Sequence, residues 1–235
     1  MIAVIQAGGK GTRLQPYTLA LPKPLMPVGD EPVLLILLKW LRKWGVKKTC
    51  ITTGYLGHLI RVLCSNNHFD MDISFSQEPE PLGTVGGLRL LENELTDTFL
   101  TVNGDLLCDL DLRAFCSFHK KRGGLLTIAV TEKIINVDLG VLKCKNNLMT
   151  DFKEKPSMRF KVSMGIYCME PDILGLIPKF MPFGFDDLVY EMLERGLPIN
   201  VFVHNGLWMD IGREEDFVHA QKHFLKEYKS IILGC

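Results

Sequence analysis

Short apolar runs alternate with amphipathic stretches along residues 1–130. The short runs are typical of buried strands, and we expect strands at 2–6, 49–53, 73–76, 99–102 and 125–131. The amphipathic stretches predict helices at 33–44, 55–64, 88–95 and 112–122. Strands that alternate with helices are typical of βαβ units. We therefore expect an α/β fold with a Rossmann-like, mainly parallel sheet flanked by helices.

The pattern changes near residue 135. Residues 139–169 hold short strand-like runs separated by turn signals such as Lys145-Asn146-Asn147, which predicts a β-rich, antiparallel insertion. A helix, a strand and a final helix are expected at 186–195, 199–203 and 214–228. The sequence thus predicts a single α/β domain over residues 1–235, with two halves at 1–135 and 136–235.

Composition and charge exclude several classes of protein. The chain has 27 Lys and Arg against 27 Asp and Glu, and this net charge of zero argues against a nucleic-acid-binding protein while allowing a small anionic ligand. The first residues carry no cationic leader, and the longest aliphatic run, 33–38, is far too short to cross a bilayer. We expect a cytoplasmic protein with no nucleic acid and no membrane as a partner.

The seven cysteines are scattered, at 50, 64, 108, 116, 144, 168 and 235, and none forms a C-x-x-C pair. This spacing excludes a zinc ribbon and a thioredoxin-like motif. The odd number indicates reduced thiols, which we expect to behave as small buried hydrophobic residues.

A glycine-rich loop follows the first strand, with the sequence Ala7-Gly8-Gly9-Lys10-Gly11-Thr12-Arg13-Leu14. Glycines let the backbone approach a ligand closely, and successive N–H groups can form a concave site for an anion. Leu14 stands where a Rossmann fingerprint needs its third glycine, and the order Lys10-Gly11-Thr12 does not match a P-loop. The loop alone therefore leaves two interpretations open: a phosphate cradle, or a tight turn with an unrelated arginine.

A second segment, Leu21-Pro22-Lys23-Pro24-Leu25-Met26-Pro27-Val28-Gly29, follows about ten residues later. Its prolines restrict φ and hold the chain extended around Lys23. Rigid placement of one ammonium group suits the binding of a phosphate better than it suits general solubility.

These two segments together resemble the sugar-1-phosphate nucleotidyltransferase family, also called nucleoside-diphosphate-sugar pyrophosphorylases. Four further regions resemble the family in the same order: the base-contacting loop at 81–87, Asn103-Gly104-Asp105 after a strand, Glu154-Lys155-Pro156, and Trp208-Met209-Asp210-Ile211-Gly212. The resemblance covers residues 2 to about 220. It is closest to members that act as guanylyltransferases on mannose 1-phosphate.

The resemblance implies a nucleotide-diphospho-sugar transferase fold with a nucleotide-binding half at 1–135 and a sugar-binding half at 136–235. The implied reaction joins a nucleoside triphosphate, most similar to GTP, to a mannose-like sugar 1-phosphate and releases pyrophosphate. Because two polyanions must meet, catalysis rests on positioning and charge neutralisation. Mg²⁺ is the implied cofactor. The length of the chain leads us to expect a catalytic domain alone, without the β-helix or the regulatory domains that many relatives carry.

The resemblance also implies a role for individual residues. Arg13, Lys23 and Asp105 are implied in catalysis, and Asp105 and Asp210 are implied as the Mg²⁺ ligands. The nucleotide-binding residues would be Ala7, Gly8, Gly9, Gly11, Thr12, Arg13, Gln77, Glu78, Gly83 and Thr84. The sugar-phosphate-binding residues would be Gly140, Glu154, Lys155 and Ser163, where Ser163 occupies a position at which many relatives carry Asn.

Several alternatives stay open at this level. The enzyme could be a thymidylyltransferase or another nucleotidyltransferase acting on glucose, glucosamine or heptose 1-phosphate, or a regulatory relative that binds nucleotide sugars without catalysis. Asp105 and Asp210 could be turn residues, and Glu154-Lys155 a surface pair. The apolar residues 180–183 predict core in preference to an interface, and a homo-oligomer is compatible with the sequence.

Overall fold

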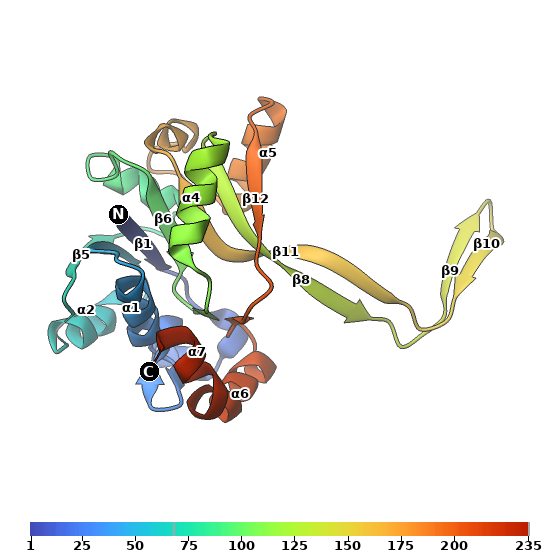
Figure 1. Ribbon diagram of the computed structural model, residues 1–235, viewed down its shortest axis with the longest axis horizontal. Coiled ribbons are helices and arrows are strands. Elements are labelled where there is room, and N and C mark those ends of the chain that lie inside the picture. Colours follow the sequence, from blue (N-terminus) through green and yellow to red (C-terminus); the bar gives the residue numbers. More distant parts are fainter. Residues whose placement is uncertain (68, 235) are drawn as a thin grey trace.

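The computed structural model describes residues 1–67 and 69–234, which are built around one seven-stranded sheet (Figure 1). The order of strands across the sheet is β12-β8-β11-β6-β1-β4-β5. Their bounds are β1 Ile2–Ala7, β4 Lys48–Thr53, β5 Asp72–Gln77, β6 Phe99–Asn103, β8 Leu126–Asn136, β11 Ser157–Met169 and β12 Ile199–Val203.

Most neighbouring strands in this sheet run parallel. β1 pairs in parallel with β4 and with β6, β4 pairs in parallel with β5, and β8 pairs in parallel with β12. The exception is β11, which lies antiparallel between β6 and β8. The predicted α/β fold with a mainly parallel sheet is therefore confirmed.

Helices flank the sheet, and two hydrophobic clusters fill the space between them. The helix bounds are α1 Val33–Lys43, α2 Gly57–Ser65, α4 Leu112–Arg122, α5 Phe185–Glu194, α6 Glu214–His223 and α7 Lys229–Leu233. Along β1, Ala3 and Ile5 belong to one cluster while Val4 belongs to the other. Because successive side chains of a strand point to opposite faces, the two clusters lie on the two sides of the sheet. The apolar run of β1 is thus buried on both sides, as a central parallel strand requires.

Shorter elements complete the chain. They are 3-10 turns at Thr12–Leu14, Tyr17–Leu19, Lys23–Leu25, Gly87–Leu91 and Pro171–Leu176, the single helical turn α3 at Gly83–Gly86, and the strand pairs β2 Pro27–Val28 with β3 Glu31–Pro32 and β7 Leu106–Cys108 with β13 Trp208–Asp210.

The prediction of a helix at 88–95 is wrong, because the chain there forms only the 3-10 turn Gly87–Leu91. Gly86 and Gly87 weaken the helix at its start, since glycine is a poor helix former. The helix predicted at 214–228 is also interrupted. It begins as α6, widens into a π-helical turn over Phe224–Tyr228, and continues as α7.

Beyond the sheet, β8 and β11 continue together as an isolated ribbon. β12 accompanies β8 only as far as Val130, and β6 accompanies β11 only from Ile166 onward. The ribbon ends in a hairpin of β9 Val141–Lys145 and β10 Leu148–Lys153. We call residues 132–162 the arm; it stands away from the body in Figure 1, and none of its residues is buried. The predicted antiparallel insertion is therefore present, and the boundary predicted at 135 falls within β8.

Two expectations about apolar residues need correction. Phe180 and Met181, expected in the core, are 74% and 59% exposed, because the segment lies at the surface between η5 and α5. Four cysteines are buried as expected, whereas Cys144 is exposed on the arm. Cys235 lies outside the described residues. In the described part of the chain no helix is both long and apolar enough to cross a membrane.

Candidate active site

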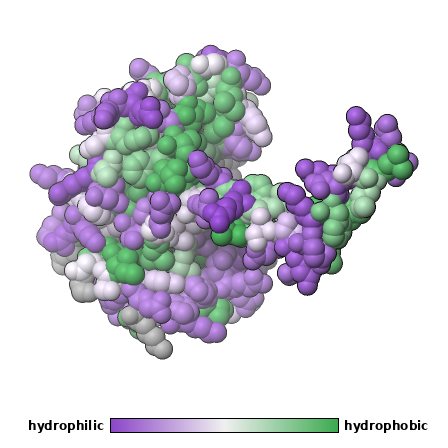
Figure 2. Space-filling model, turned by 45° about the vertical axis from the view of Figure 1, so that its right-hand side comes forward, coloured by the Kyte–Doolittle hydropathy of each residue, from purple (hydrophilic) through white to green (hydrophobic). Residues whose placement is uncertain are grey.

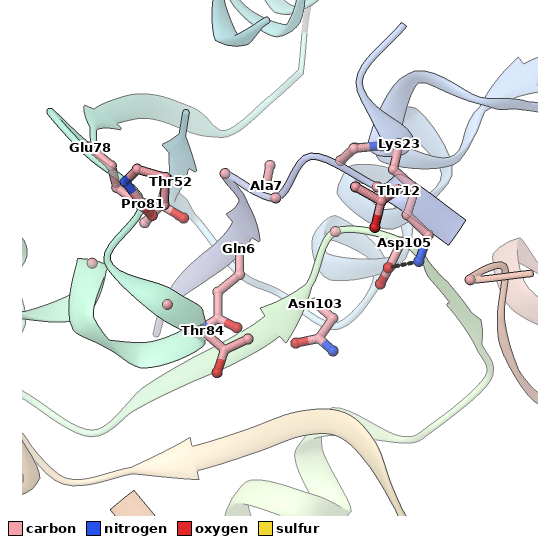
Figure 3. A pocket seen from close by; sticks show the side chains of 18 of the residues that line it. Gln6, Ala7, Thr12, Lys23, Thr52, Glu78, Pro81, Thr84, Asn103 and Asp105 are labelled. Carbon is pink, nitrogen blue, oxygen red and sulfur yellow. Dashed lines mark hydrogen bonds and ion pairs between the residues drawn. The ribbon is translucent and has the colours of Figure 1, made fainter. Parts of the chain in front are cut away.

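A cavity of about 430 Å³ opens where β1, β4 and β6 reach their carboxyl ends (Figure 3). Ligands of open α/β sheets bind at this edge, because the loops that leave the strands gather there. The residues around the cavity are Gln6, Ala7, Gly8, Gly9, Gly11, Thr12, Arg13, Lys23, Pro24, Thr52, Glu78, Pro81, Gly83, Thr84, Gly87, Leu88, Asn103, Gly104, Asp105 and Gly212. Its volume suits a small organic ligand.

The glycine-rich loop forms one wall of the cavity. Gly11 has φ +62°, a left-handed conformation that glycine adopts without strain, and its carbonyl accepts a hydrogen bond from Thr18 Oγ1 at 2.9 Å. The chain then forms the 3-10 turn Thr12–Leu14, which buries Leu14 and leaves Arg13 exposed at the rim. In residues 1–67 and 69–234 the guanidinium of Arg13 forms no ion pair. It is therefore a free cation beside the cavity.

Lys23 lies at the floor of the cavity with its side chain only 9% exposed. Its ammonium donates to Asp105 Oδ2 and, at 3.4 Å, to Asp210 Oδ1 (Figure 3 marks the pair with Asp105). Pro22 and Pro24 flank it, and Pro24 packs close to the backbone of Gly104, so the lysine is fixed on both sides. The predicted rigid placement of this ammonium group is present.

The two carboxylates come together because two distant segments pair. β7 follows Asp105 immediately, and it pairs antiparallel with β13, which ends at Asp210. The N–H of Ile211 also donates to the carbonyl of Asp105 at 3.0 Å. Residues more than one hundred positions apart are thus joined at one end of the cavity. A side chain at Gly212 would approach both Asp210 and the ammonium of Lys23, so glycine keeps this corner open.

Burial governs the electrostatics of this corner. Loss of solvent raises the pKa of Asp105 above its usual range, and the opposing effect of the Lys23 ammonium is smaller. The negative charge of Asp210 raises the pKa of Asp105 further. Two hard oxygen donors that share a single ammonium are a suitable donor set for a cation such as Mg²⁺.

Glu78 lies on the opposite side of the cavity, after β5. Its Oε2 accepts the backbone N–H of Leu82 at 3.1 Å, and burial raises the pKa of its carboxyl. A Cβ at Gly8 or Gly87 would lie 2.9 or 2.8 Å from Oε1, so both positions need glycine to leave room for this carboxylate. Gln77 does not face the cavity, and its Oε1 accepts from Thr53 Oγ1 at 3.1 Å.

The loop carrying Gly83 and Thr84 is held by the segment before α5. The N–H groups of Val85 and Gly86 donate to the carbonyl of Phe183, and the hydroxyl of Thr84 accepts the N–H of Phe185 at 2.7 Å. Gly83 has φ +78° and packs against the backbone of Phe183. This second wall is therefore fixed by residues of the later half of the chain.

The structure also identifies a cavity residue that the sequence interpretation missed. Gln6 lines the cavity, and both its Nε2 and its Oε1 are buried without a hydrogen-bond partner among the described residues (Figure 3). A buried amide without partners costs free energy, so its presence indicates that a ligand supplies the missing bonds. Asn103, Thr52 and Pro24 were likewise not predicted. The only signal for Gln6 was a polar residue inside an apolar strand.

The predicted sugar-phosphate residues divide into two groups. Ser163 lies at the base of the arm, where its hydroxyl donates to Tyr167 Oη at 3.2 Å, and the nearby Gly165 packs against Asn103 of the cavity. Gly140, Glu154 and Lys155 lie far out on the arm and do not line this cavity. Their expected role therefore remains a prediction.

Comparisons with known proteins place these features in a family. The family model described as nucleotidyl transferase matches residues 2–227. Mannose-1-phosphate guanyltransferase of Saccharomyces cerevisiae is 31% identical over 96% of this chain and 65% of its own length, and that of Aspergillus oryzae is 34% identical over 93% and 62%. This chain thus spans slightly less than two thirds of the length of these relatives.

Solved structures agree in fold. HddC from Yersinia pseudotuberculosis, both alone and complexed with GMP-PN, matches with a TM-score of 0.74 and 26% identity, covering 95% of this chain and 99% of HddC. Together with the match over residues 2–227, the glycine-rich loop and the lysine–carboxylate cluster lead to one conclusion: the chain belongs to the nucleotidyl transferase family.

Proposed function

We propose that this protein transfers a nucleoside monophosphate from GTP to a mannose-like sugar 1-phosphate, giving a GDP-sugar and pyrophosphate. The observation that carries the proposal is the cluster of Lys23, Asp105 and Asp210 at the floor of a cavity whose rim is the glycine-rich loop. It offers a fixed cation and two carboxylates with oxygens that can ligate a metal, next to backbone N–H groups suited to phosphates. The relatives named mannose-1-phosphate guanyltransferase support the choice of substrates.

The chemistry asks mainly for charge neutralisation. An oxygen of the sugar 1-phosphate forms a bond to the α-phosphorus of the triphosphate, and the bond from that phosphorus to the β-bridging oxygen breaks, with its electron pair leaving on pyrophosphate. The attacking oxygen is already ionised at neutral pH, so no strong general base is needed. The barrier comes from bringing two polyanions together and from the charge that develops on the leaving group.

The chain's own cations can meet both demands. The N–H groups of the loop at 8–12 bind the triphosphate, and Arg13 at the rim grips the β- and γ-phosphates with its planar fork. Lys23 neutralises charge at the α-phosphate, where its fixed position limits the reorganisation needed during the reaction. Arg13, Lys23 and Asp105 are accordingly the proposed catalytic residues.

The donor set at this corner fits a divalent metal. Asp105 and Asp210 would hold Mg²⁺, because both already face one cation and both offer carboxylate oxygens. When bound, the metal supplies positive charge to the oxygens of the triphosphate.

Two polar groups of the cavity support guanine as the base. Glu78 presents a carboxylate oxygen that can accept from the N1–H and amino group of guanine, and Gln6 presents an unpartnered amide that can donate to its O6. HddC, a structural relative, has been determined with GMP-PN. The free thiols at the described cysteines suit a reducing cytoplasm, which we propose as the location.

A pyrophosphate-release assay tests the proposal. GTP, dTTP, UTP, CTP and ATP are each combined with mannose, glucose, glucosamine and heptose 1-phosphates, with Mg²⁺ and with a chelator. We expect release only when GTP, a mannose-like sugar 1-phosphate and Mg²⁺ are all present. Binding of GTP without turnover for any sugar phosphate would favour a non-catalytic regulatory relative instead.

A further inference from the structure

A cysteine, an aspartate and a histidine meet at the end of the β7–β13 pair that is opposite to Asp105 and Asp210. Cys108 is the last residue of β7, Asp109 follows it, and His204 directly follows β12. One ligand atom of each lies within 4.8 Å of the other two. None of the three residues lines the cavity of the candidate active site. This Cys-Asp-His cluster is therefore a separate feature, which the proposed function does not use.

The backbone of the cluster is held by hydrogen bonds between distant segments. Cys108 belongs to the ladder of β7 with β13, and the N–H of Asp109 donates to the carbonyl of Leu207 at 3.2 Å. The N–H of His204 donates to the carbonyl of Val130 at 2.8 Å, which fixes the chain where it leaves β12. Ligands held on rigid elements lose little conformational freedom when they bind an ion.

The side chains of the cluster are close to the spacing that a metal ion requires. The Nε2 of His204 lies 2.8 Å from Asp109 Oδ1. Around a tetrahedral zinc ion, with bonds of about 2.0–2.3 Å, the ligand atoms lie about 3.3–3.6 Å from one another. Side-chain shifts of about 1 Å therefore convert the observed spacing into a zinc coordination shell.

A glycine leaves space beside the two polar ligands. A Cβ at Gly206 would lie 2.5 Å from Asp109 Oδ1 and 2.7 Å from His204 Cε1. Gly206 does not have the left-handed φ that favours glycine at positions such as Gly11. The reason for glycine here is thus the space next to the ligand atoms rather than the backbone conformation.

The cluster combines a buried thiol with two ligands that solvent reaches. Cys108 is 1% exposed, whereas the side chains of Asp109 and His204 are 22% and 12% exposed. In Figure 2 many side chains on the surface of the body are hydrophilic, so exposed polar groups alone do not indicate a site. Here the two polar groups lie directly over a buried sulfur atom. An ion can enter from solvent past the carboxylate and the imidazole and reach the thiol.

The sulfur atom also has the hydrogen bond that suits a metal-bound thiolate. The backbone N–H of Leu110 donates to Cys108 Sγ at 3.1 Å. Hydrogen bonds to ligating atoms orient them and stabilise their charge when a metal is bound. Burial raises the pKa of the Cys108 thiol, so the thiol carries its proton in the free protein.

The chemistry of the donor atoms selects the class of ion. Mg²⁺ prefers hard oxygen ligands, which Asp105 and Asp210 offer at the cavity floor. Thiolate and imidazole ligands suit zinc and neighbouring transition metals instead. Three protein ligands with water in the fourth position are a common coordination shell of Zn²⁺. The two ends of the β7–β13 pair therefore suit different ions.

We propose that Cys108, Asp109 and His204 bind one Zn²⁺ ion, with a water molecule as the fourth ligand. The ion forms bonds to sulfur, to a carboxylate oxygen and to an imidazole nitrogen, and the proton of the thiol is released to solvent. Because β7 joins this cluster to Asp105, the bound ion stabilises the strand pair that brings Asp105 and Asp210 together. The proposal does not depend on the reaction proposed above.

Titration with Co²⁺ tests the site, because this ion takes the place of zinc and reports a thiolate ligand by its absorption. The full chain, purified without metal-affinity resin and treated with a chelator, is titrated with Co²⁺ and then with Zn²⁺. We expect one Co²⁺ per chain with a sulfur-to-cobalt charge-transfer band in the near ultraviolet, which Zn²⁺ then removes. A protein that shows no such band would overturn the proposal.

Variants assign the band to the cluster. Cys108→Ala and His204→Gln should abolish it and weaken Zn²⁺ binding by more than about 10²-fold, since loss of even a hydrogen-bond partner of a ligand costs about 10–10²-fold. The matched controls Cys64→Ala, a buried cysteine on α2, and His58→Gln, an exposed histidine on α2, should leave both unchanged. His204 is near the surface, so its variant tests the site even if Cys108→Ala fails to fold.

Competition with Mg²⁺ separates the cluster from the carboxylates of the cavity. Excess Mg²⁺ should leave the band of the wild type unchanged, and Zn²⁺ should raise the melting temperature of the wild type but not of His204→Gln. Cobalt that Mg²⁺ displaces, and that binds without a sulfur band, would lie at Asp105 and Asp210 instead. That result, or equal Zn²⁺ affinity in wild type and His204→Gln, would overturn the proposal whether or not the protein transfers nucleotides.

Discussion

The cavity and the arm are built in opposite ways. Around the cavity, Lys23 is flanked by prolines, Asp105 and Asp210 are brought together by β7 and β13, and the loop at 83–86 is bonded to Phe183. The arm is held by its own ladder of hydrogen bonds and by ion pairs within it, such as Arg159 with Glu132, and many of its apolar side chains face solvent. The difference indicates that the cavity is held rigid by contacts between distant segments of the chain, whereas the arm depends on contacts within itself.

The largest effect is expected at the cavity floor. Lys23→Ala removes a fixed cation, and turnover should fall by about 10²–10³-fold, as for loss of other preorganised electrostatic groups. It also leaves Asp105 and Asp210 without their partner, and the free energy of unfolding should fall by about 2 kcal/mol, less than for a fully buried pair because Asp210 is 41% exposed. Steady-state kinetics and urea denaturation measure the two effects.

Lys10→Ala is the matched control for this variant, because Lys10 is an exposed lysine of the glycine-rich loop that does not line the cavity. It should change stability by less than about 0.5 kcal/mol. Equal losses in the two variants would show that the position of the ammonium in the cavity is unimportant.

A substitution in the arm should affect activity toward the sugar phosphate without affecting stability, in contrast to Lys23→Ala. Lys155→Ala should lower kcat/KM for the sugar 1-phosphate by about 10–10²-fold, the value of a hydrogen bond to a charged group, and leave GTP affinity and stability unchanged. Calorimetry with GTP, denaturation, and kinetics at varied sugar phosphate measure these quantities. A loss of GTP affinity equal to the loss in kcat/KM would contradict the proposal that Lys155 contacts the sugar phosphate and not the nucleotide.

Replacement of Gln6 tests whether its buried amide serves ligand binding or the stability of the cavity. Gln6→Leu removes an amide that is buried without a partner in the described part of the chain, so the free protein should become more stable by up to about 1 kcal/mol. Affinity for GTP should fall by about tenfold, since a hydrogen bond to the base is lost. Reduced stability together with unchanged GTP affinity would show that the amide has a structural role only.

Glu78 gives the smallest expected effect and a pH dependence. Burial raises the pKa of its carboxyl, so the folded protein binds this proton more tightly than the unfolded chain. Its contribution to stability is therefore present below the unfolded pKa and is lost as pH rises through the higher folded value. Glu78→Gln should flatten stability measured by denaturation across this acidic range and weaken GTP binding at pH 7 by about tenfold or less. An unchanged pH profile would remove Glu78 as the source of this dependence.

Local sequence signals predicted much of the fold and many of the residues that line the cavity. The βαβ alternation, the loop at 7–14 and the proline-flanked Lys23 are all features of neighbouring residues, which a sequence displays directly. Gln77 and Glu78 were indistinguishable by this reasoning, because only the pairing of β5 decides which side chain faces the cavity.

The remaining features depend on long-range structure. The arm leaves the sheet because β12 ends at Val203 and β6 begins to accompany β11 only at Ile166, and neither end is encoded in the arm itself. The exposure of Phe180 and Met181 depends in the same way on how α5 packs. Position within a tertiary structure, rather than residue type, determines these outcomes.

The most direct test of the central claim follows the α-phosphate of GTP. Protein is incubated with GTP labelled at that phosphate, mannose 1-phosphate and Mg²⁺, and the products are separated by chromatography. The account predicts that the label appears in a GDP-sugar, with one unlabelled pyrophosphate released per product. Label that stays in GTP, or that enters GMP or GDP regardless of the sugar phosphate, would contradict nucleotidyl transfer at this site.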